Sequence, residues 1–185
     1  IRCGHNPLLI FAKHQNVEMV SWLLKFGLEV NFADQFGKNI LVYAVELGNL
    51  ELFERIVDHG PKLTARKPRD TTILMDACIG GNMEFFNRLL ELGADINEFN
   101  KLGQNALHYV AKHGNVKFIS RLLEAGADIA LRDTQNIPLV FYACQNLNRT
   151  VFTFLLDHGM DAKATTKNGA TAIHYAIMNG SSSIE

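Results

Sequence analysis

The sequence predicts an all-α solenoid in which pairs of short helices are stacked in register. Three sequence columns with a common period support this prediction. A glycine recurs every 33 residues, an asparagine recurs at the same interval, and a third column holds only glycine, asparagine or aspartate. Because no insertion or deletion breaks the register from Gly4 to Ser181, the columns indicate internal repeats and not chance matches.

The glycine column marks where the second helix of each repeat is expected to end. Each glycine follows a pair of aliphatic residues by three positions, as Gly27 follows Leu23-Leu24. A residue just past a helix end often has a positive φ, which costs glycine little and strains other residues. The members of this column are Gly27, Gly60, Gly93, Gly126 and Gly159.

The asparagine column marks where the second helices are expected to begin. An asparagine or serine side chain accepts hydrogen bonds from the unpaired amides of a first helical turn. A glycine precedes the asparagine in the second, third and fourth repeats, which favours a tight turn between two antiparallel helices. The members of this column are Asn16, Asn49, Asn82, Asn115 and Asn148, continued by Ser181.

The third column predicts a tight turn before the first helix of each repeat, because its residues tolerate such turns. In the fifth repeat Pro138 stands one position early and no glycine precedes Asn148, so we expect irregular turns there. The members of this column are Gly4, Gly37, Asp70, Gly103, Asn136 and Gly169.

Between the turns the pattern is helical. In the fourth repeat Val116, Ile119, Leu122 and Leu123 fall on one face of a helix. The first helix of each repeat is short and contains small residues, which allow neighbouring helices to approach closely. A pair of short helices cannot bury its apolar face alone, whereas a stack of pairs can.

These units resemble the ankyrin repeat, a turn and two helices with the signature T-P-L-H-x-A. Matching segments include TILMDA at 72–77, NALHYV at 105–110 and TAIHYA at 171–176. The resemblance covers essentially the whole chain and implies an ankyrin-repeat solenoid of helix-turn-helix units with short β-hairpin loops. It implies a single array of about five and a half repeats over residues 1–185, namely 1–33, 34–66, 67–99, 100–132, 133–165 and the partial repeat 166–185.

Composition limits the possible partners. Lys+Arg 18 and Asp+Glu 19 give a net charge of -1, so we expect no nucleic-acid binding. No apolar run approaches the roughly 20 residues that span a bilayer, so we expect no membrane insertion. The three distant cysteines favour a reducing, intracellular and cytoplasmic setting. Ile1 is no initiator methionine and the sixth repeat stops within a helix, so we expect the solenoid to continue beyond both ends.

No arrangement typical of catalysis is visible, so we expect no enzymatic activity, no cofactor and no metal. His108 and His174 share a repeat position, and the resemblance implies that this histidine braces the turn. Cys78 and Cys144 share a column of small apolar residues, which predicts buried and inert thiols. The sequence contains no CxxC pair, no phosphate-binding glycine loop and no serine elbow.

All four tyrosines fall in one column, at Tyr43, Tyr109, Tyr142 and Tyr175, and Asp76 takes this position in the third repeat. One interpretation is a packing ladder along the first helices. The other is that Asp76 accepts a hydrogen bond from a tyrosine hydroxyl or from a ligand. The sequence leaves both interpretations open.

The resemblance implies that a partner binds the concave side, formed by hairpin tips and the ends of the first helices. Phe36, Leu47, Ile79 and Leu102 are apolar at such positions, which indicates an interface. The predicted partner-binding residues are Phe36, Lys38, Leu47, Arg69, Ile79, Lys101, Leu102, Gln104, Lys112 and His113.

A basic run accompanies these apolar residues on adjacent hairpins. Arg66, Lys67, Arg69 and Lys101 belong to it, with Lys112 and His113 close by. The run either engages an acidic partner or is merely solvated.

We therefore expect a non-catalytic protein–protein interaction module or scaffold within a larger intracellular protein. The alternative is the substrate-recognition arm of a multidomain enzyme, such as a ubiquitin-ligase adaptor, a kinase or a secreted bacterial effector. In that case the catalytic domain would lie outside this chain.

Overall fold

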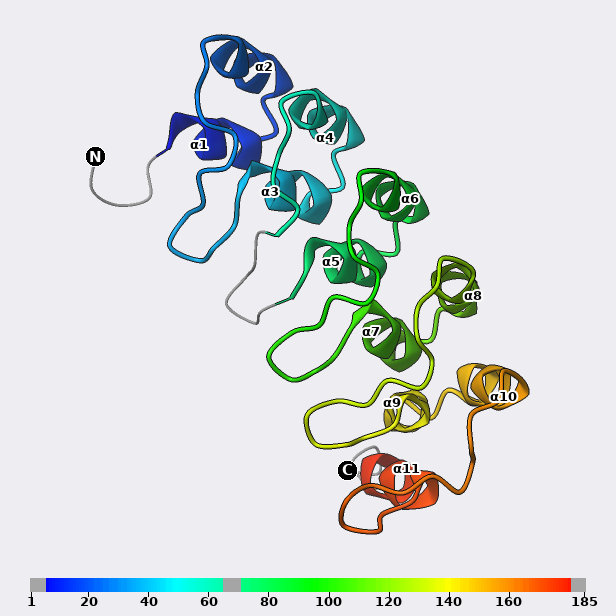
Figure 1. Cartoon of the computed structure of the whole chain (residues 1–185). Helices are drawn as coiled ribbons and strands as arrows, with labels where there is room; N and C mark the ends of the chain where they lie inside the picture. The colour runs from blue at the N-terminus through cyan, green and yellow to red at the C-terminus, as the bar shows by residue number, and fades with distance from the viewer. Residues whose placement is uncertain (1–5, 65–70, 181–185) are drawn as a thin grey trace. The chain divides into compact units, whose positions relative to one another are not determined.

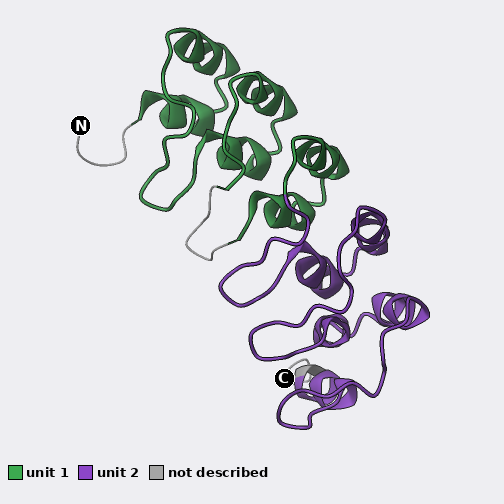
Figure 2. Cartoon of the chain, in the orientation of Figure 1, with its two compact units in different colours: residues 1–94 green, residues 95–185 purple. Residues whose placement is uncertain are grey.

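The computed structural model of the chain describes residues 6–64 and 71–180. The chain forms two compact units, Ile1–Ala94 and Asp95–Glu185, which Figure 2 shows in different colours. Within the described residues every regular element is a helix, apart from two isolated β-bridges. Figure 1 labels these helices in chain order. The prediction of an all-α fold is confirmed.

Unit 1 is a row of helix pairs, each with a short inner helix followed by an outer helix. The pairs are α1 (Pro7–Lys13) with α2 (Val17–Lys25), α3 (Ile40–Glu46) with α4 (Leu50–Val57), and α5 (Ile73–Ile79) with α6 (Met83–Glu91). Each inner helix packs against its own outer helix, and α3 packs between α1 and α5. The stacking predicted from the 33-residue period is therefore present in this unit.

Unit 2 repeats the same arrangement. Its helices are α7 (Ala106–His113) with α8 (Val116–Glu124), α9 (Leu139–Gln145) with α10 (Arg149–Asp157), and the inner helix α11 (Ala172–Gly180). Inner helix α9 packs between α7 and α11, and outer helices α8 and α10 also pack together.

Aliphatic and aromatic side chains fill the space between successive pairs. In unit 1 Phe53 and Phe85 are fully buried and meet edge to face, with ring centroids 5.1 Å apart and an interplanar angle of 75°. Aromatic pairs favour this geometry, and burial of each ring stabilises the fold by roughly 1.5–3 kcal/mol. In unit 2 Phe118 on outer helix α8 and Phe141 on inner helix α9 are buried. The core thus lies between the repeats, as expected for units that cannot fold alone.

The outer helices begin as predicted, because each is capped by the asparagine before it. The side-chain oxygen of Asn82, for example, accepts hydrogen bonds from the amides of Glu84 and Phe85 at 3.0 and 3.3 Å. These bonds satisfy amides that have no partner within the helix. The caps are Asn16, Asn49, Asn82, Asn115 and Asn148.

The turn between the helices of the fifth repeat differs from its neighbours. Leu147 stands where Gly48, Gly81 and Gly114 precede the asparagine cap, and it has the same left-handed backbone, with φ of 51°. For a residue with a Cβ this conformation costs about 1–2 kcal/mol. The irregularity expected there is therefore a strained residue, and α10 still follows in register.

The hairpin loops before the inner helices of unit 2 carry the β-bridges. Arg132 bridges Pro138, and Thr165 bridges Thr171, both in antiparallel fashion. Pro138 serves as the N-cap of α9 without a side-chain hydrogen bond. The hairpin of the fifth repeat is therefore closed despite the early proline.

Candidate functional site

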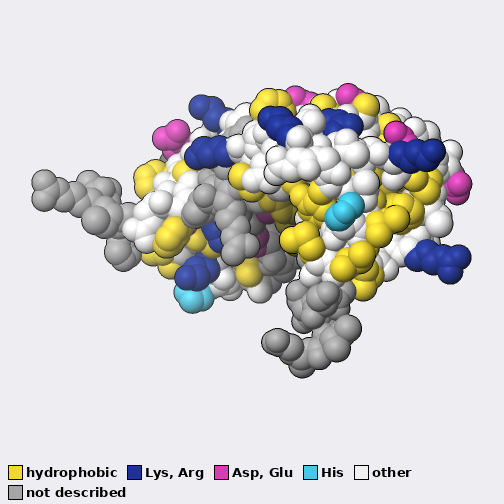
Figure 3. Space-filling view, turned by 90° about the horizontal axis from the view of Figure 1, so that it is seen from below, with side chains coloured by type: hydrophobic (Ala, Val, Ile, Leu, Met, Phe, Trp, Pro, Cys, Tyr) yellow, Lys and Arg dark blue, Asp and Glu magenta, His cyan; other side chains and the backbone are white. Residues whose placement is uncertain are grey.

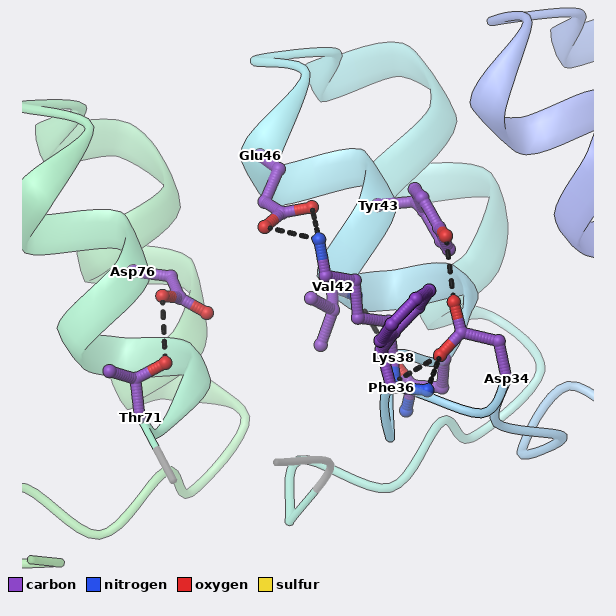
Figure 4. Close-up of polar contacts among 9 residues, drawn as sticks. Asp34, Phe36, Lys38, Val42, Tyr43, Glu46, Thr71 and Asp76 are labelled. Atoms are coloured by element: carbon purple, nitrogen blue, oxygen red, sulfur yellow. Dashed lines mark hydrogen bonds and ion pairs between the residues drawn. The ribbon is translucent and has the colours of Figure 1, made fainter. Parts of the chain in front are cut away.

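The predicted partner-binding residues lie on two kinds of element, the hairpin loops and the C-terminal ends of the inner helices. We call this surface the inner face of each unit. In unit 1 the loop at residues 34–39 is shaped by Asp34, whose Oδ1 accepts hydrogen bonds from the amides of Phe36 and Lys38 at 2.8 and 3.0 Å. Gly37 has a φ of 73° at the turn. These hydrogen bonds (Figure 4) fix the backbone of Phe36, whose side chain is half exposed.

Lys38 has a partner within its own unit. Its Nζ lies 3.0 Å from both carboxylate oxygens of Glu46 on α3, and 5.6 Å from the centroid of the Tyr43 ring. The Tyr43 hydroxyl donates in turn to Oδ2 of Asp34 at 2.8 Å (Figure 4). Burial, with this bond to the Asp34 carboxylate, raises the pKa of Tyr43 to about 12. The charge of Lys38 is therefore balanced locally, and its contact with a partner stays a prediction.

Three apolar residues of unit 1 are exposed on the inner face. Phe36 is 50% exposed in its loop, Leu47 is 37% exposed at the C-cap of α3, and Ile79 is 46% exposed as the last residue of α5. Because α3 and α5 pack side by side, Leu47 and Ile79 come from adjacent helix ends. The exposure expected from the sequence is confirmed for all three.

In unit 2 the tip formed by Lys101 and Leu102 is held by hydrogen bonds on both sides. Asn100 Oδ1 accepts from the amides of Leu102 and Gln104 at 2.9 and 3.0 Å. The Leu102 carbonyl accepts from the amide and the hydroxyl of Thr134 in the next hairpin, at 2.9 and 3.1 Å. Leu102 is nonetheless 54% exposed. Hydrogen bonds therefore fix the backbone of the tip, while its side chains are accessible to a partner.

Gln104 is an internal brace. Its Nε2 donates to the Tyr142 hydroxyl at 2.8 Å, and that hydroxyl donates to Asp133 Oδ2 at 2.7 Å. Burial is the main reason why the pKa of Tyr142 is raised, with the Asp133 bond second. These bonds tie the loop of one repeat to the inner helix of the next. The prediction that Gln104 contacts a partner remains, but its amide nitrogen already has this bond.

Lys112 and His113 lie in the last turn of α7 and are exposed. The Lys112 carbonyl accepts a 2.6 Å hydrogen bond from Asn146 Nδ2 after the next inner helix, so the backbone beneath these side chains is fixed. Gly114 ends α7 with a φ of 87°. Both side chains thus project from an anchored helix end.

The predicted site is divided between the units. Phe36, Leu47 and Ile79 belong to unit 1, whereas Lys101 and Leu102 belong to unit 2. The structure therefore shows an exposed apolar group on unit 1 and an exposed hairpin tip on unit 2. Three residues of the predicted basic run, Arg66, Lys67 and Arg69, lie outside the described residues.

The tyrosine column has an interpretation that the sequence did not offer. Tyr43 and Tyr142 donate to an aspartate nine positions earlier, and Tyr109 accepts from Asn100 Nδ2 at the same spacing. These tyrosines therefore tie each hairpin to its inner helix. Asp76 accepts a 3.3 Å hydrogen bond from the Thr71 hydroxyl. The Tyr43 hydroxyl donates to Asp34 of its own repeat, and a bond from another tyrosine or from a ligand to Asp76 stays a prediction.

The histidine and cysteine predictions are confirmed. His108 Nδ1 accepts from the Asn105 amide at 3.2 Å, and burial lowers the pKa of His108 to about 4. His174 Nδ1 likewise accepts from the Thr171 amide at 3.1 Å. Cys78 and Cys144 are buried free thiols. Among the described residues no three histidines, cysteines or carboxylates are grouped to hold a metal ion.

Among the exposed apolar features that were not predicted, the first is an aromatic pair at the C-terminal end of α2, where Phe26 is the C-cap. Trp22 and Phe26 are exposed there, with ring centroids 4.3 Å apart. The sequence does distinguish Trp22, because the next three repeats have arginine at its position, namely Arg55, Arg88 and Arg121.

The second feature is an apolar groove in unit 2 between α9, α10 and α11. It has a volume of about 240 Å³, and Ile173 at its edge is 71% exposed although its equivalent Leu107 is buried. Figure 3 shows hydrophobic side chains gathered on the face seen from below, where Figure 1 places α11. The lining residues are Ala143, Cys144, Leu147, Asn148, Arg149, Phe152, Ala172, Ile173 and Ala176.

In the part of the chain that the structure describes, no helix is long and apolar enough to cross a membrane.

The chain matches a known family model. The family described as ankyrin repeats, in three copies, matches residues 1–67, 61–133 and 131–184. No curated protein matches the sequence. The family matches therefore span nearly the whole chain, in agreement with the repeat columns.

Proposed function

Because the chain belongs to the ankyrin-repeat family, whose members are generally protein–protein interaction modules, we propose that it binds a partner protein over its inner face and is not catalytic. Loops and helix ends supply the contacts, and the stacked helices behind them hold these contacts in place. An intracellular location is part of this proposal, since Cys78 and Cys144 are free thiols.

The observation that carries the proposal is the exposure of large apolar side chains on the inner face of unit 1. Phe36, Leu47 and Ile79 each keep a large part of their apolar surface exposed after the chain has folded. Burial within the chain therefore does not explain why these three positions are apolar. A partner that covered them would gain the burial energy of each side chain, up to roughly 1.5–3 kcal/mol for the phenylalanine. Single exposed apolar residues are common, but a group on neighbouring repeats is typical of an interface.

The state of the buried titratable groups supports a non-catalytic role. Burial, with the nearby Asp76 carboxylate, raises the pKa of the Cys78 thiol to about 12, so this thiol is protonated at neutral pH. A protonated, buried thiol is a poor nucleophile. His108 is buried and its Nδ1 is engaged at the start of α7, so it is not placed as a base for a substrate.

The experiment is a selection of displayed protein fragments from the organism that makes this protein, with the full chain as bait. We expect Phe36→Ala and Ile79→Ala to weaken the binding of each selected fragment by about 2 kcal/mol or more, as for residues at the centre of an interface. The thermal midpoint should hardly change, because exposed substitutions usually alter stability by less than about 0.5 kcal/mol.

Lys25→Ala on outer helix α2 is the matched control, since Lys25 is exposed on the other kind of helix. Fragments that bind both inner-face variants as well as the unchanged chain would contradict the proposal. A large fall in the midpoint would place Phe36 or Ile79 in the core and would also contradict it.

A further inference from the structure

We propose that the inner face of unit 2 binds an acidic polypeptide segment that carries an apolar side chain. This inference rests on the proposed function and adds to it the chemistry of the partner. It concerns unit 2 alone, namely its hairpin loops at 100–105, 133–138 and 166–171 and the last turns of α7 and α9.

Lysines supply the exposed charged side chains of these segments. Lys101 and Lys167 lie in the loops, and Lys112 and His113 lie in the last turn of α7. The single acidic residue in these segments is Asp133, and its carboxylate is turned inward. Its Oδ1 accepts from the amides of Gln135 and Ile137 at 2.9 and 2.8 Å, and its Oδ2 accepts from Tyr142 at 2.7 Å. A ligand on this face would therefore contact the ammonium groups of the lysines, with no exposed carboxylate from these segments nearby.

Unit 1 has an ion pair between a hairpin loop and an inner helix at positions where the described part of unit 2 has none. In unit 1 Lys38 in the loop pairs with Glu46 near the end of the inner helix at 3.0 Å. In the fourth repeat these two positions are held by Gln104 and Lys112. Among the described residues no ion pair involves Lys112 or Lys101. An acidic ligand would supply the carboxylates that the chain itself supplies in unit 1.

The groups that would meet the ligand stand on a fixed backbone. The Leu102 carbonyl is held by two hydrogen bonds from Thr134, and the Lys112 carbonyl by one from Asn146. Preorganised groups lose less conformational entropy on binding than mobile loops do. Leu102, exposed beside Lys101, offers a contact for an apolar side chain, and the lysines offer contacts for carboxylates on either side of it.

A polypeptide fits this face better than a nucleic acid. Single-stranded nucleic acids bind by stacking bases on exposed aromatic rings, and within the loops and last turns named above the one phenylalanine, tyrosine or tryptophan side chain, Tyr142, is buried. The guanidinium of Arg132 donates to the carbonyls of Asn136 and Thr165, so it is used within the hairpins. Lysine ammonium groups act as point charges, which suits carboxylates.

The test is a selection of random displayed peptides on the full chain, repeated on the double variant Lys101→Glu with Lys112→Glu. We expect the unchanged chain to enrich aspartate and glutamate around a leucine, isoleucine or phenylalanine. We expect the variant to enrich lysine and arginine. A synthetic peptide from the first selection should bind the double variant about tenfold more weakly or worse, and should bind more weakly at high salt, mainly through a slower association rate.

The control has the same change in charge at a different place. Lys25→Glu with Lys117→Glu alters exposed lysines on outer helices α2 and α8, so the selected peptide should bind it as it binds the unchanged chain. Circular dichroism of both double variants verifies folding. Equal losses in the two variants would show a general effect of net charge and would overturn the inference.

Selection of uncharged peptides would also overturn it, as would tighter binding of a single-stranded oligonucleotide than of the acidic peptide. Either result leaves the proposed function intact, because that function depends on Phe36 and Ile79 and on protein fragments in a separate selection. Loss of both sets of results would remove the proposed function as well.

Discussion

At Gly103 one hairpin of unit 2 lies close to the backbone of the next hairpin. A Cβ placed there would lie 2.8 Å from the Thr134 amide nitrogen and 3.1 Å from the Asp133 carbonyl carbon, both backbone atoms that cannot rotate away. The residue also has a φ of +71°, which strains any side chain. We therefore expect Gly103→Ala to be destabilised by about 1–2 kcal/mol from the backbone conformation and by a further 1–3 kcal/mol from overpacking.

Gly126→Ala separates the two contributions. Gly126 has a φ of +92°, and no atom lies within 4 Å of the position that an added Cβ would take, so only the conformational cost applies there. Equilibrium urea denaturation of both variants should show an excess loss of about 1–3 kcal/mol for Gly103→Ala. Hydrogen exchange at the Thr134 amide should accelerate in Gly103→Ala alone, because that amide donates to Leu102. Equal free-energy losses with unchanged exchange at Thr134 would refute the close approach of the two hairpins.

The remaining predictions concern a cap, a buried hydroxyl and a buried imidazole. Asn82→Ala should lower the free energy of unfolding by about 1 kcal/mol, since the amides of the first turn of α6 lose their acceptor; an unchanged urea midpoint would contradict the capping role. Tyr142→Phe should cost about 1–3 kcal/mol, because Asp133 and Gln104 both lose a partner; a variant as stable as the unchanged chain would show that water replaces the hydroxyl without loss. Burial lowers the pKa of His108 from 6.5 to about 4. Stability that is fully present above pH 6.5 should therefore be lost as the pH falls towards 4, by up to about 3 kcal/mol from this residue. His108→Phe, which copies Phe141 of the next repeat, should remove that part of the pH dependence; an equal slope in urea titrations of both proteins would show that other groups cause it.

The predictions from local sequence were confirmed where one residue type performs one local structural role. The asparagine caps are an example, because the first turn of any helix has amides without partners and Asn82 meets that need within three residues. The exposure of Phe36 and Ile79 was also predictable, since their positions in the repeat face away from the stack. Arg69 lies outside the described residues, so its place in the candidate site stays a prediction.

The sequence by itself determined the all-α repeat architecture, because a 33-residue period of helix caps, helix ends and apolar faces permits few other packings. Only the tertiary structure decided which polar side chains remain available on the inner face. Lys38 and Lys112 are both basic residues of the candidate site, but among the described residues the structure places only Lys38 of the two in an ion pair, with Glu46. Gln104, which occupies in the fourth repeat the position of Lys38, donates instead to the Tyr142 hydroxyl. The physical reason is that a hydrogen bond or an ion pair depends on the distance between atoms from different elements, and the packing of the repeats sets that distance.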